Sequence, residues 1–184
     1  MDGFTFMDGV YVYFVTFTIV DWLPIFINPE PINIIIDSLR FCIIEKHLRV
    51  YAYVIMPNHI HLVVFDANFS NSRLQKTLSE FRRFTGHRLA NYVDKNLSES
   101  FVKVCSRGAL SDRAKQIWQQ GWHAEGLVSE RFLKQKVDYV HENPVRKGYV
   151  REPEHWMHSS AGFWFAGIES SIPIAEIIEG EEKR

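Results

Sequence analysis

The sequence predicts a single α+β domain, with an antiparallel sheet and helices packed mostly on one of its faces. The chain has 184 residues, of which 46% are hydrophobic and 23% charged, as expected for one globular domain with a buried core. Segments of strand composition alternate with segments of helical periodicity. Their order along the chain, β-α-β-β-α-β-α, is typical of this fold class.

The first two elements are a strand and a helix. Residues 10–20 (VYVYFVTFTIV) are β-branched and aromatic, which favours a strand. Prolines at positions 24, 29 and 31 are expected to break the chain. Over residues 32–47 apolar side chains recur every three or four positions, which predicts a helix.

A hairpin and a long helix come next. Residues 50–56 and 59–65 have strand composition, and the Pro57-Asn58 pair between them is typical of a turn. Residues 71–92 combine an apolar stripe with a polar stripe at helical spacing, which predicts an amphipathic helix.

The last predicted elements lie beyond an ambiguous stretch, residues 94–114, where apolar spacing hints at a short helix. Residues 117–127 are rich in tryptophan and are interpreted as the fourth strand. Ser129 is a suitable N-cap for a helix over 130–143. Because Pro144 disfavours helical backbone in the residue before it, this helix is expected to end near Asn143.

Composition bears on the cellular compartment and on the distribution of charge. Two cysteines provide no disulfide framework, which favours a reducing cytoplasm, and no apolar run approaches the ~18 residues that cross a membrane. The N-terminus has no basic segment before an apolar one, so no secretory signal is expected. The net charge of −1 hides an asymmetry, because residues 152–184 hold seven acids and two bases and leave a net charge of +4 in residues 1–151.

Two histidines form the first candidate site. In a strand, side chains alternate between faces, so His59 and His61 lie side by side on one face of the sheet. Two imidazoles at this spacing suit one divalent metal ion. The alternative is two polar side chains on a half-exposed strand. A histidine-triad hydrolase is rejected because position 63 is valine.

The helix over 130–143 carries the second candidate site. Tyr139 and Asn143 are i, i+4 neighbours, so their side chains converge. Tyr139 is a candidate nucleophile, and Lys136 one turn before it is a candidate cation to favour the phenolate. Asn143 has an amide oxygen suited to a hard divalent ion. His141 is interpreted as structural or DNA-facing, and a purely structural tyrosine is the alternative for Tyr139.

Basic side chains are concentrated on the two helices that hold or precede these residues. The candidate DNA-binding residues are Lys76, Arg82, Arg83, His87, Arg88, Arg131, Lys136, Arg146 and Lys147. Such clusters would neutralise phosphates. Tyr51, Tyr53, Trp118, Trp122, Trp156 and Trp164 are candidate platforms for unpaired bases. The alternative is that the charges are solvated and the tryptophans belong to the core.

Two motifs carry a family resemblance. MPNHIHLVVF (56–65) followed by YVHENPVRKGYV (139–150) resembles the single-tyrosine HUH transposases, and most of all the REP-associated tyrosine transposases. WQQGWHAEGL and EHWMHSSAGFW resemble other segments of that branch. The resemblance covers roughly residues 10–165. Residues 1–165 are interpreted as the HUH endonuclease domain and residues 166–184 as an acidic C-terminal tail.

The resemblance implies a ferredoxin-like fold and cleavage of single-stranded DNA near hairpins. His59 and His61 would hold Mg²⁺ or Mn²⁺, with Asn143 as third ligand where relatives often have glutamine. Tyr139 would attack the phosphate and leave a 5′-phosphotyrosine link, without a nucleotide cofactor. Hairpin DNA is the expected partner, with no membrane, in a cytoplasmic, nucleoid-associated monomer or homodimer. The alternative is a domesticated, non-catalytic hairpin-binding protein; a replication initiator or relaxase fits poorly with this length.

Overall fold

The computed structural model describes residues 9–107 and 115–175. In chain order the elements are β1 (Tyr13–Thr18), η1 (Val20–Trp22), α1 (Pro29–Glu45), β2 (Leu48–Met56), β3 (His59–Asp66), α2 (Asn71–Asn96), α3 (Glu99–Arg107), β4 (His123–Gly126), α4 (Glu130–Arg146), η2 (Pro153–His155) and α5 (Ala161–Ala166). No helix in these two ranges is both long enough and apolar enough to cross a membrane.

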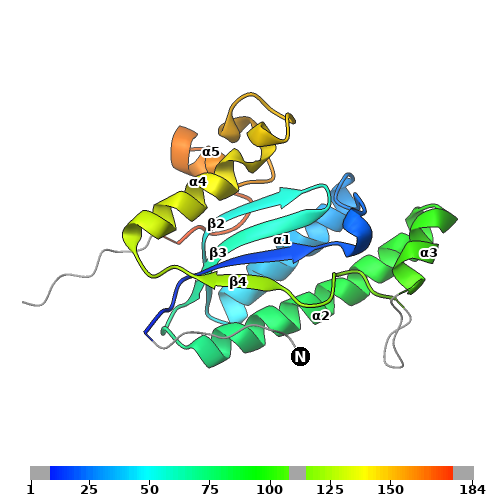
Figure 1. Ribbon diagram of the computed structural model, residues 1–184, viewed down its shortest axis with the longest axis horizontal. Coiled ribbons are helices and arrows are strands. Elements are labelled where there is room, and N and C mark those ends of the chain that lie inside the picture. Colours follow the sequence, from blue (N-terminus) through cyan, green and yellow to red (C-terminus); the bar gives the residue numbers. More distant parts are fainter. Residues whose placement is uncertain (1–8, 108–114, 176–184) are drawn as a thin grey trace, which may run out of the picture.

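The four strands form one antiparallel sheet in the order β2-β3-β1-β4. This order and the β-α-β-β-α-β succession are those of a ferredoxin-like sheet. The predicted α+β class is therefore confirmed. Figure 1 shows α1 and α2 on one side of the sheet and α4 with α5 on the other. Helices thus cover both faces, although the prediction placed them mostly on one.

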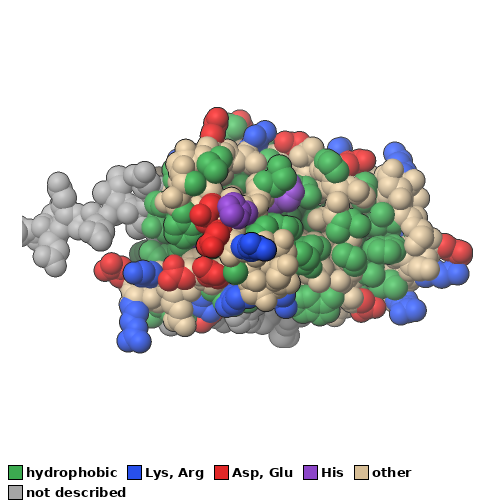
Figure 2. Space-filling model, turned by 90° about the horizontal axis from the view of Figure 1, so that it is seen from above, with side chains coloured by type: hydrophobic (Ala, Val, Ile, Leu, Met, Phe, Trp, Pro, Cys, Tyr) green, Lys and Arg blue, Asp and Glu red, His purple; other side chains and the backbone are tan. Residues whose placement is uncertain are grey.

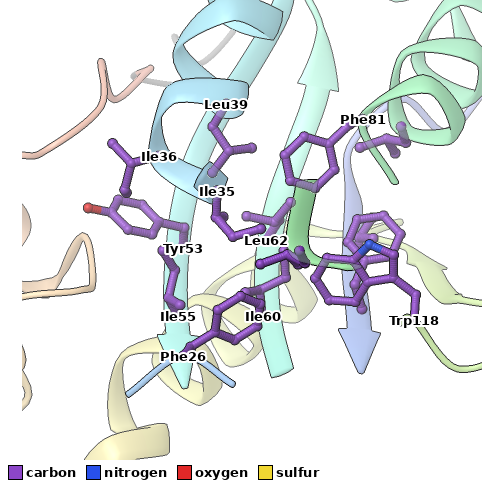
Figure 3. Close-up of a cluster of buried hydrophobic side chains, with 14 of the residues drawn as sticks. Phe26, Ile35, Ile36, Leu39, Tyr53, Ile55, Ile60, Leu62, Phe81 and Trp118 are labelled. Atoms are coloured by element: carbon purple, nitrogen blue, oxygen red, sulfur yellow. The ribbon is translucent and has the colours of Figure 1, made fainter. Parts of the chain in front are cut away.

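Strand alternation divides the core between these two faces. Tyr13, Val15 and Phe17 of β1 join α1 and α2 in the larger cluster, whereas Phe14 between them belongs to a smaller cluster under α4. Figure 3 shows part of the larger cluster, where Leu62 lies among side chains of α1 and α2. Because neighbouring residues of β3 point to opposite faces, Leu62 joins the larger cluster and Val63 the smaller cluster under α4.

Two elements differ from expectation because proline acts differently near helix ends. Helix α1 begins at Pro29 rather than at residue 32, since proline is well tolerated in a first turn, where no N–H donor is needed. Helix α4 ends at Arg146 rather than near Asn143, with Pro144 inside it. Pro144 removes only one bond of the last turn, and the burial of Asn143 and Pro144 holds that turn in place.

The expected strand over 117–127 is shorter than predicted. Only His123–Gly126 pairs with β1 as a strand, while Trp118 makes an isolated bridge to Ile19. Gly121 has a φ of +69°, which interrupts the extended backbone between these two parts. In the ambiguous stretch over 94–114, α3 forms the short helix, and residues 108–114 lie outside the described residues.

The chain after α4 covers the outer edge of β2. The Ser160 backbone N–H donates to the Tyr53 carbonyl over 3.0 Å, and Ala175 N donates to the Val50 carbonyl over 2.8 Å. Ile172 is buried in the larger core cluster. The first part of the expected tail, up to residue 175, is therefore packed against the domain, and residues 176–184 lie outside the described residues.

Candidate active site

The two histidines lie at the start of β3, on the face of the sheet that α4 covers. Their ring centroids are 4.6 Å apart, and both side chains are buried. Across the strand pair, His61 faces Thr16 and His59 faces Thr18 of β1. The prediction that alternation places the two imidazoles side by side is borne out by this geometry.

Each imidazole is anchored through its Nδ1 atom. The Thr16 hydroxyl lies 2.7 Å from Nδ1 of His61, and the Asn58 side-chain oxygen lies 2.7 Å from Nδ1 of His59. Asn58 also donates from its side-chain nitrogen to the Trp22 carbonyl over 3.3 Å, which orients its oxygen toward His59. An amide oxygen only accepts, so His59 must donate from Nδ1 and keep a lone pair on Nε2.

The protonation of the pair also suits ligands. Burial lowers the pKa of His59 to about 4, and the nearby charge of Lys147 adds to this shift. Burial likewise holds the pKa of His61 well below its usual range, with further contributions from His59, Arg146 and Lys136. Both rings are therefore neutral at pH 7, which is the state in which an imidazole binds a metal ion.

Helix α4 brings Tyr139 to the histidine pair. Its N-cap Ser129 accepts a hydrogen bond from Phe132 N, and its apolar face packs on the smaller core cluster. The Tyr139 ring stands edge-on to the His61 ring at 5.3 Å. Asn143 is 3% exposed and lies one turn further along. His61 from one motif and Tyr139 from the other thus meet between β3 and α4, with His59 beside His61 on the same strand.

Two buried polar atoms, one on β3 and one on α4, are suitable ligands for a metal ion. Within residues 9–107 and 115–175, Nε2 of His61 and Oδ1 of Asn143 are buried without a hydrogen-bond partner. Such groups are costly to bury unless something binds them. No further His, Cys, Asp or Glu joins the two histidines in a group of three among the described residues. The fitting donor set is therefore two imidazoles and one amide oxygen.

The positively charged side chain that contacts Tyr139 is Arg146, whereas the sequence analysis proposed Lys136. The Lys136 amino group is 2.5 Å from the Glu125 carboxylate and lies over the Phe14 ring. The Arg146 guanidinium lies 4.1 Å from the centroid of the Tyr139 ring and donates to the Tyr139 carbonyl over 3.1 Å. The signal for Arg146 was its place two turns after Tyr139 on the same helix face.

The basic residues of α2 do not adjoin the histidine pair. Their helix packs its apolar stripe on the opposite face of the sheet. Arg82 donates to the Gln119 and Gly121 carbonyls before β4, and Arg83, His87 and Arg88 line a groove between α1 and α2. Lys76 is exposed on the same helix. Figure 2, viewed from the side of α4 and α5, shows basic side chains scattered among acidic and apolar ones.

Two of the candidate stacking platforms lie in the core. Tyr53 and Trp118 are buried in the core, so they cannot stack on bases. Trp22, which the sequence interpretation passed over, is exposed and lies edge-on to His59 at 5.8 Å. His141 is buried, with Nε2 2.8 Å from the Ser160 hydroxyl, as its structural interpretation requires.

Comparisons with known proteins confirm the resemblance and the fold. No family model matches the chain. A putative REP-associated tyrosine transposase of Haemophilus influenzae is 26% identical over 113 residues, which are 59% of this chain. The match covers 56% of that relative, so the chain spans about half the length of the curated relative it matches.

Two solved structures are similar. A REP-associated tyrosine transposase bound to a REP hairpin shares the fold, with a TM-score of 0.60 and 17% sequence identity over 98% of both chains. A transposase-like protein from Deinococcus radiodurans has a TM-score of 0.47 and 15% identity, covering 77% of this chain and 93% of that one.

Proposed function

We propose that this chain is a transposase-type nickase and strand-transferase for single-stranded DNA that contains hairpins. The observation that carries the proposal is the contact of the Tyr139 ring with the His61 ring, whose buried Nε2 has no hydrogen-bond partner; the buried Oδ1 of Asn143, on the same helix as Tyr139, has none either. The similarity to a REP-associated tyrosine transposase supports DNA processing, and the REP hairpin in the similar solved structure supports the substrate class.

The proposed cofactor is Mg²⁺ or Mn²⁺, held by His59, His61 and Asn143. When bound, such an ion would withdraw negative charge from the phosphate to be cleaved. The two anchored Nδ1 atoms leave both Nε2 atoms as the available ligand atoms, and the neutral state of both rings supports binding. Three protein ligands leave room for phosphate oxygens and water.

The proposed nucleophile is the Tyr139 hydroxyl. Its oxygen forms a bond to the phosphorus while the bond from phosphorus to the 3′-oxygen breaks, and the 3′-oxygen leaves as a hydroxyl after taking a proton. The phenolic proton passes to solvent, which reaches this side chain because it is 37% exposed. Arg146 favours the negative charge that develops on the attacking oxygen. The 5′-phosphotyrosine link retains the phosphodiester energy, so rejoining needs no nucleotide cofactor.

The proposed DNA contacts follow the two faces of the sheet. Arg131, Arg146 and Lys147 lie exposed on or just after α4 and would bind phosphates near the cleaved bond. Lys136, which is paired with Glu125, would act there mainly by holding α4 against β4. The α2 residues Lys76, Arg83, His87 and Arg88 would contact DNA farther from the site. Arg82 would instead fix the segment before β4.

Tyr139 reaches the histidines of its own chain, which supports a site that works within a monomer. A homodimer that exchanges α4 would need to break the packing of α4 on β2 and β3.

The test is to incubate a REP-like hairpin oligonucleotide that carries single-stranded flanks with the protein and Mn²⁺, and to look for a covalent adduct on a denaturing gel. Tyr139→Phe should abolish the adduct and keep hairpin affinity within about threefold, because only the hydroxyl is lost. Tyr149→Phe is the matched control, since Tyr149 is exposed and packs on Trp156. An adduct that persists in Tyr139→Phe would rule out this nucleophile. Hairpin binding unaffected by chelator and without any adduct would favour a non-catalytic binding protein.

A further inference from the structure

The turn after β1 holds two neighbouring residues in an uncommon backbone conformation. Asp21 and Trp22 have φ values of 50° and 55°, in the left-handed region that side chains other than glycine disfavour. Hydrogen bonds hold the turn on both sides, from Val20 N to the Ile117 carbonyl over 2.8 Å and from the Asn58 side chain to the Trp22 carbonyl over 3.3 Å. Such conformations persist where the surroundings impose them, and they gather at ligand sites.

This backbone aims the Trp22 side chain away from the core. The residues that follow, Ile25 and Phe26, are almost fully buried, whereas the indole of Trp22 is 56% exposed. The indole lies edge-on to His59, with 5.8 Å between ring centroids. A large aromatic side chain that gains little burial, in a turn that disfavours it, is not explained by stability of the domain.

The surroundings of Trp22 identify the kind of ligand. His59 is a proposed metal ligand on β3, and Lys147 is exposed just after α4, the helix that packs on β2 and β3. Arg146 lies over the nucleophile candidate on the same side of the sheet. An exposed aromatic ring beside His59, on the side of the sheet where α4 carries cations, suits a nucleotide, because the phosphate is drawn to the positive charges and the base can stack on the ring.

We propose that the indole of Trp22 is a stacking platform for one unpaired nucleobase of the strand whose phosphate is held at His59 and His61. This inference rests on the proposed function and adds a base subsite to it. Because every base has a π-face, the subsite selects for an unpaired nucleotide at a fixed distance from the cleaved phosphate, with little preference for its identity. It gives a physical reason for cleavage in the single-stranded flank of a hairpin.

The test combines a protein change with a DNA change. A set of hairpin oligonucleotides carries one abasic site at each successive position of the single-stranded flank, and affinities are measured in chelator so that no cleavage occurs. For the intact DNA, Trp22→Leu should weaken binding roughly 5- to 150-fold, the range that base–aromatic stacking provides. One abasic position should weaken binding to the wild-type protein by the same factor and have no further effect on Trp22→Leu. Trp22→Phe, which keeps a ring, should recover most of the affinity.

The matched control is Phe69→Leu. Phe69 is 55% exposed with a φ of 52°, and it follows the other end of β3, remote from His59. The inference would be overturned if Trp22→Leu and Phe69→Leu lost the same DNA affinity. It would also be overturned if the losses from Trp22→Leu and from an abasic site were additive at every abasic position. The Mn²⁺ affinity of Trp22→Leu measured without DNA distinguishes base stacking from a role in the metal site. If Trp22 only stacks on a base, this affinity should stay within about twofold of wild type. A larger change in Mn²⁺ affinity than in DNA affinity would show that Trp22 serves the metal site instead.

The two levels of the proposal fail in different ways. A wild-type protein that binds no hairpin oligonucleotide and forms no adduct would remove the proposed function itself. A wild-type protein that binds and cleaves hairpins, with an affinity indifferent to Trp22→Leu, would remove only the base subsite.

Discussion

Thr16→Val probes the proposed metal site without touching any ligand. Valine keeps the shape of threonine and its preference for strands, but it removes the hydroxyl that lies 2.7 Å from Nδ1 of His61. That nitrogen would then be buried without a partner, at a cost of about 1–3 kcal/mol if it keeps its proton. The ring can avoid this cost by moving the proton to Nε2, and it then presents no lone pair to the metal ion.

The expected consequence is a loss of Mn²⁺ affinity of about 10- to 100-fold, the usual effect of removing a group that orients a metal-binding histidine. This corresponds to about 1.4–2.8 kcal/mol of binding free energy. Calorimetric titration of the DNA-free protein with Mn²⁺ measures it directly. Thr16→Ser retains a hydroxyl and should restore most of the affinity.

Thr18→Val is the matched control, because Thr18 lies on the same strand and faces His59, whose Nδ1 is anchored by Asn58 instead. Its Mn²⁺ affinity should stay within about twofold of wild type. The reasoning would be refuted if Thr16→Val bound Mn²⁺ as wild type does, or if both valine variants lost the same affinity. Unfolding curves of both variants would show whether either loss reflects a damaged fold.

Two further predictions concern stability. Burial lowers the pKa of His59 and His141 to about 4, whereas an unfolded histidine titrates near 6.5, so below pH 6.5 the unfolded chain takes up protons that the folded chain does not. The free energy of unfolding of the metal-free protein should therefore fall by about 2 kcal/mol for each of these histidines between pH 7.5 and pH 5, and urea unfolding that is unchanged over this window would contradict the assignment. Ser160→Ala should cost about 2–4 kcal/mol, because Nε2 of His141 and the Tyr53 backbone N–H both lose their partner. A change below about 1 kcal/mol in urea unfolding would mean that the hydroxyl is dispensable there.

The central part of the site was predictable because it depends on short-range rules. Period-two alternation places His59 and His61 on one face whatever the rest of the sheet does. The i, i+4 spacing of Tyr139 and Asn143 likewise depends only on their helix. The comparisons then support the resemblance that joined the two motifs, and the structure shows His61 of one motif in contact with Tyr139 of the other.

The surroundings of the site were less predictable because they depend on long-range packing. Lys136 and Arg146 are both plausible neighbours of Tyr139 along the helix, and Glu125 from β4 decides between them by pairing with Lys136. The role of Thr16 depends on the register between β1 and β3, which no local pattern reveals.

The position of the basic residues of α2 relative to the site was unpredictable for the same reason. These residues are visible in the sequence, but the face that α2 covers follows from the sheet topology. The groove lined by Arg83 and His87 therefore lies across the sheet from the candidate active site. The charges in the sequence alone could not show whether a basic cluster lies on the same face of the sheet as the candidate active site or on the opposite face.

The segment that covers β2 bears on how copies of this protein can meet. Sheets of separate chains commonly join by adding strand to strand along an edge, through backbone groups that are still free. Along β2 the carbonyls of Val50 and Tyr53 already accept hydrogen bonds from Ala175 and Ser160 of the same chain. A second copy would have to displace this segment before its sheet could continue there. The C-terminal segment thus disfavours association of two copies of the chain through the β2 edge of the sheet.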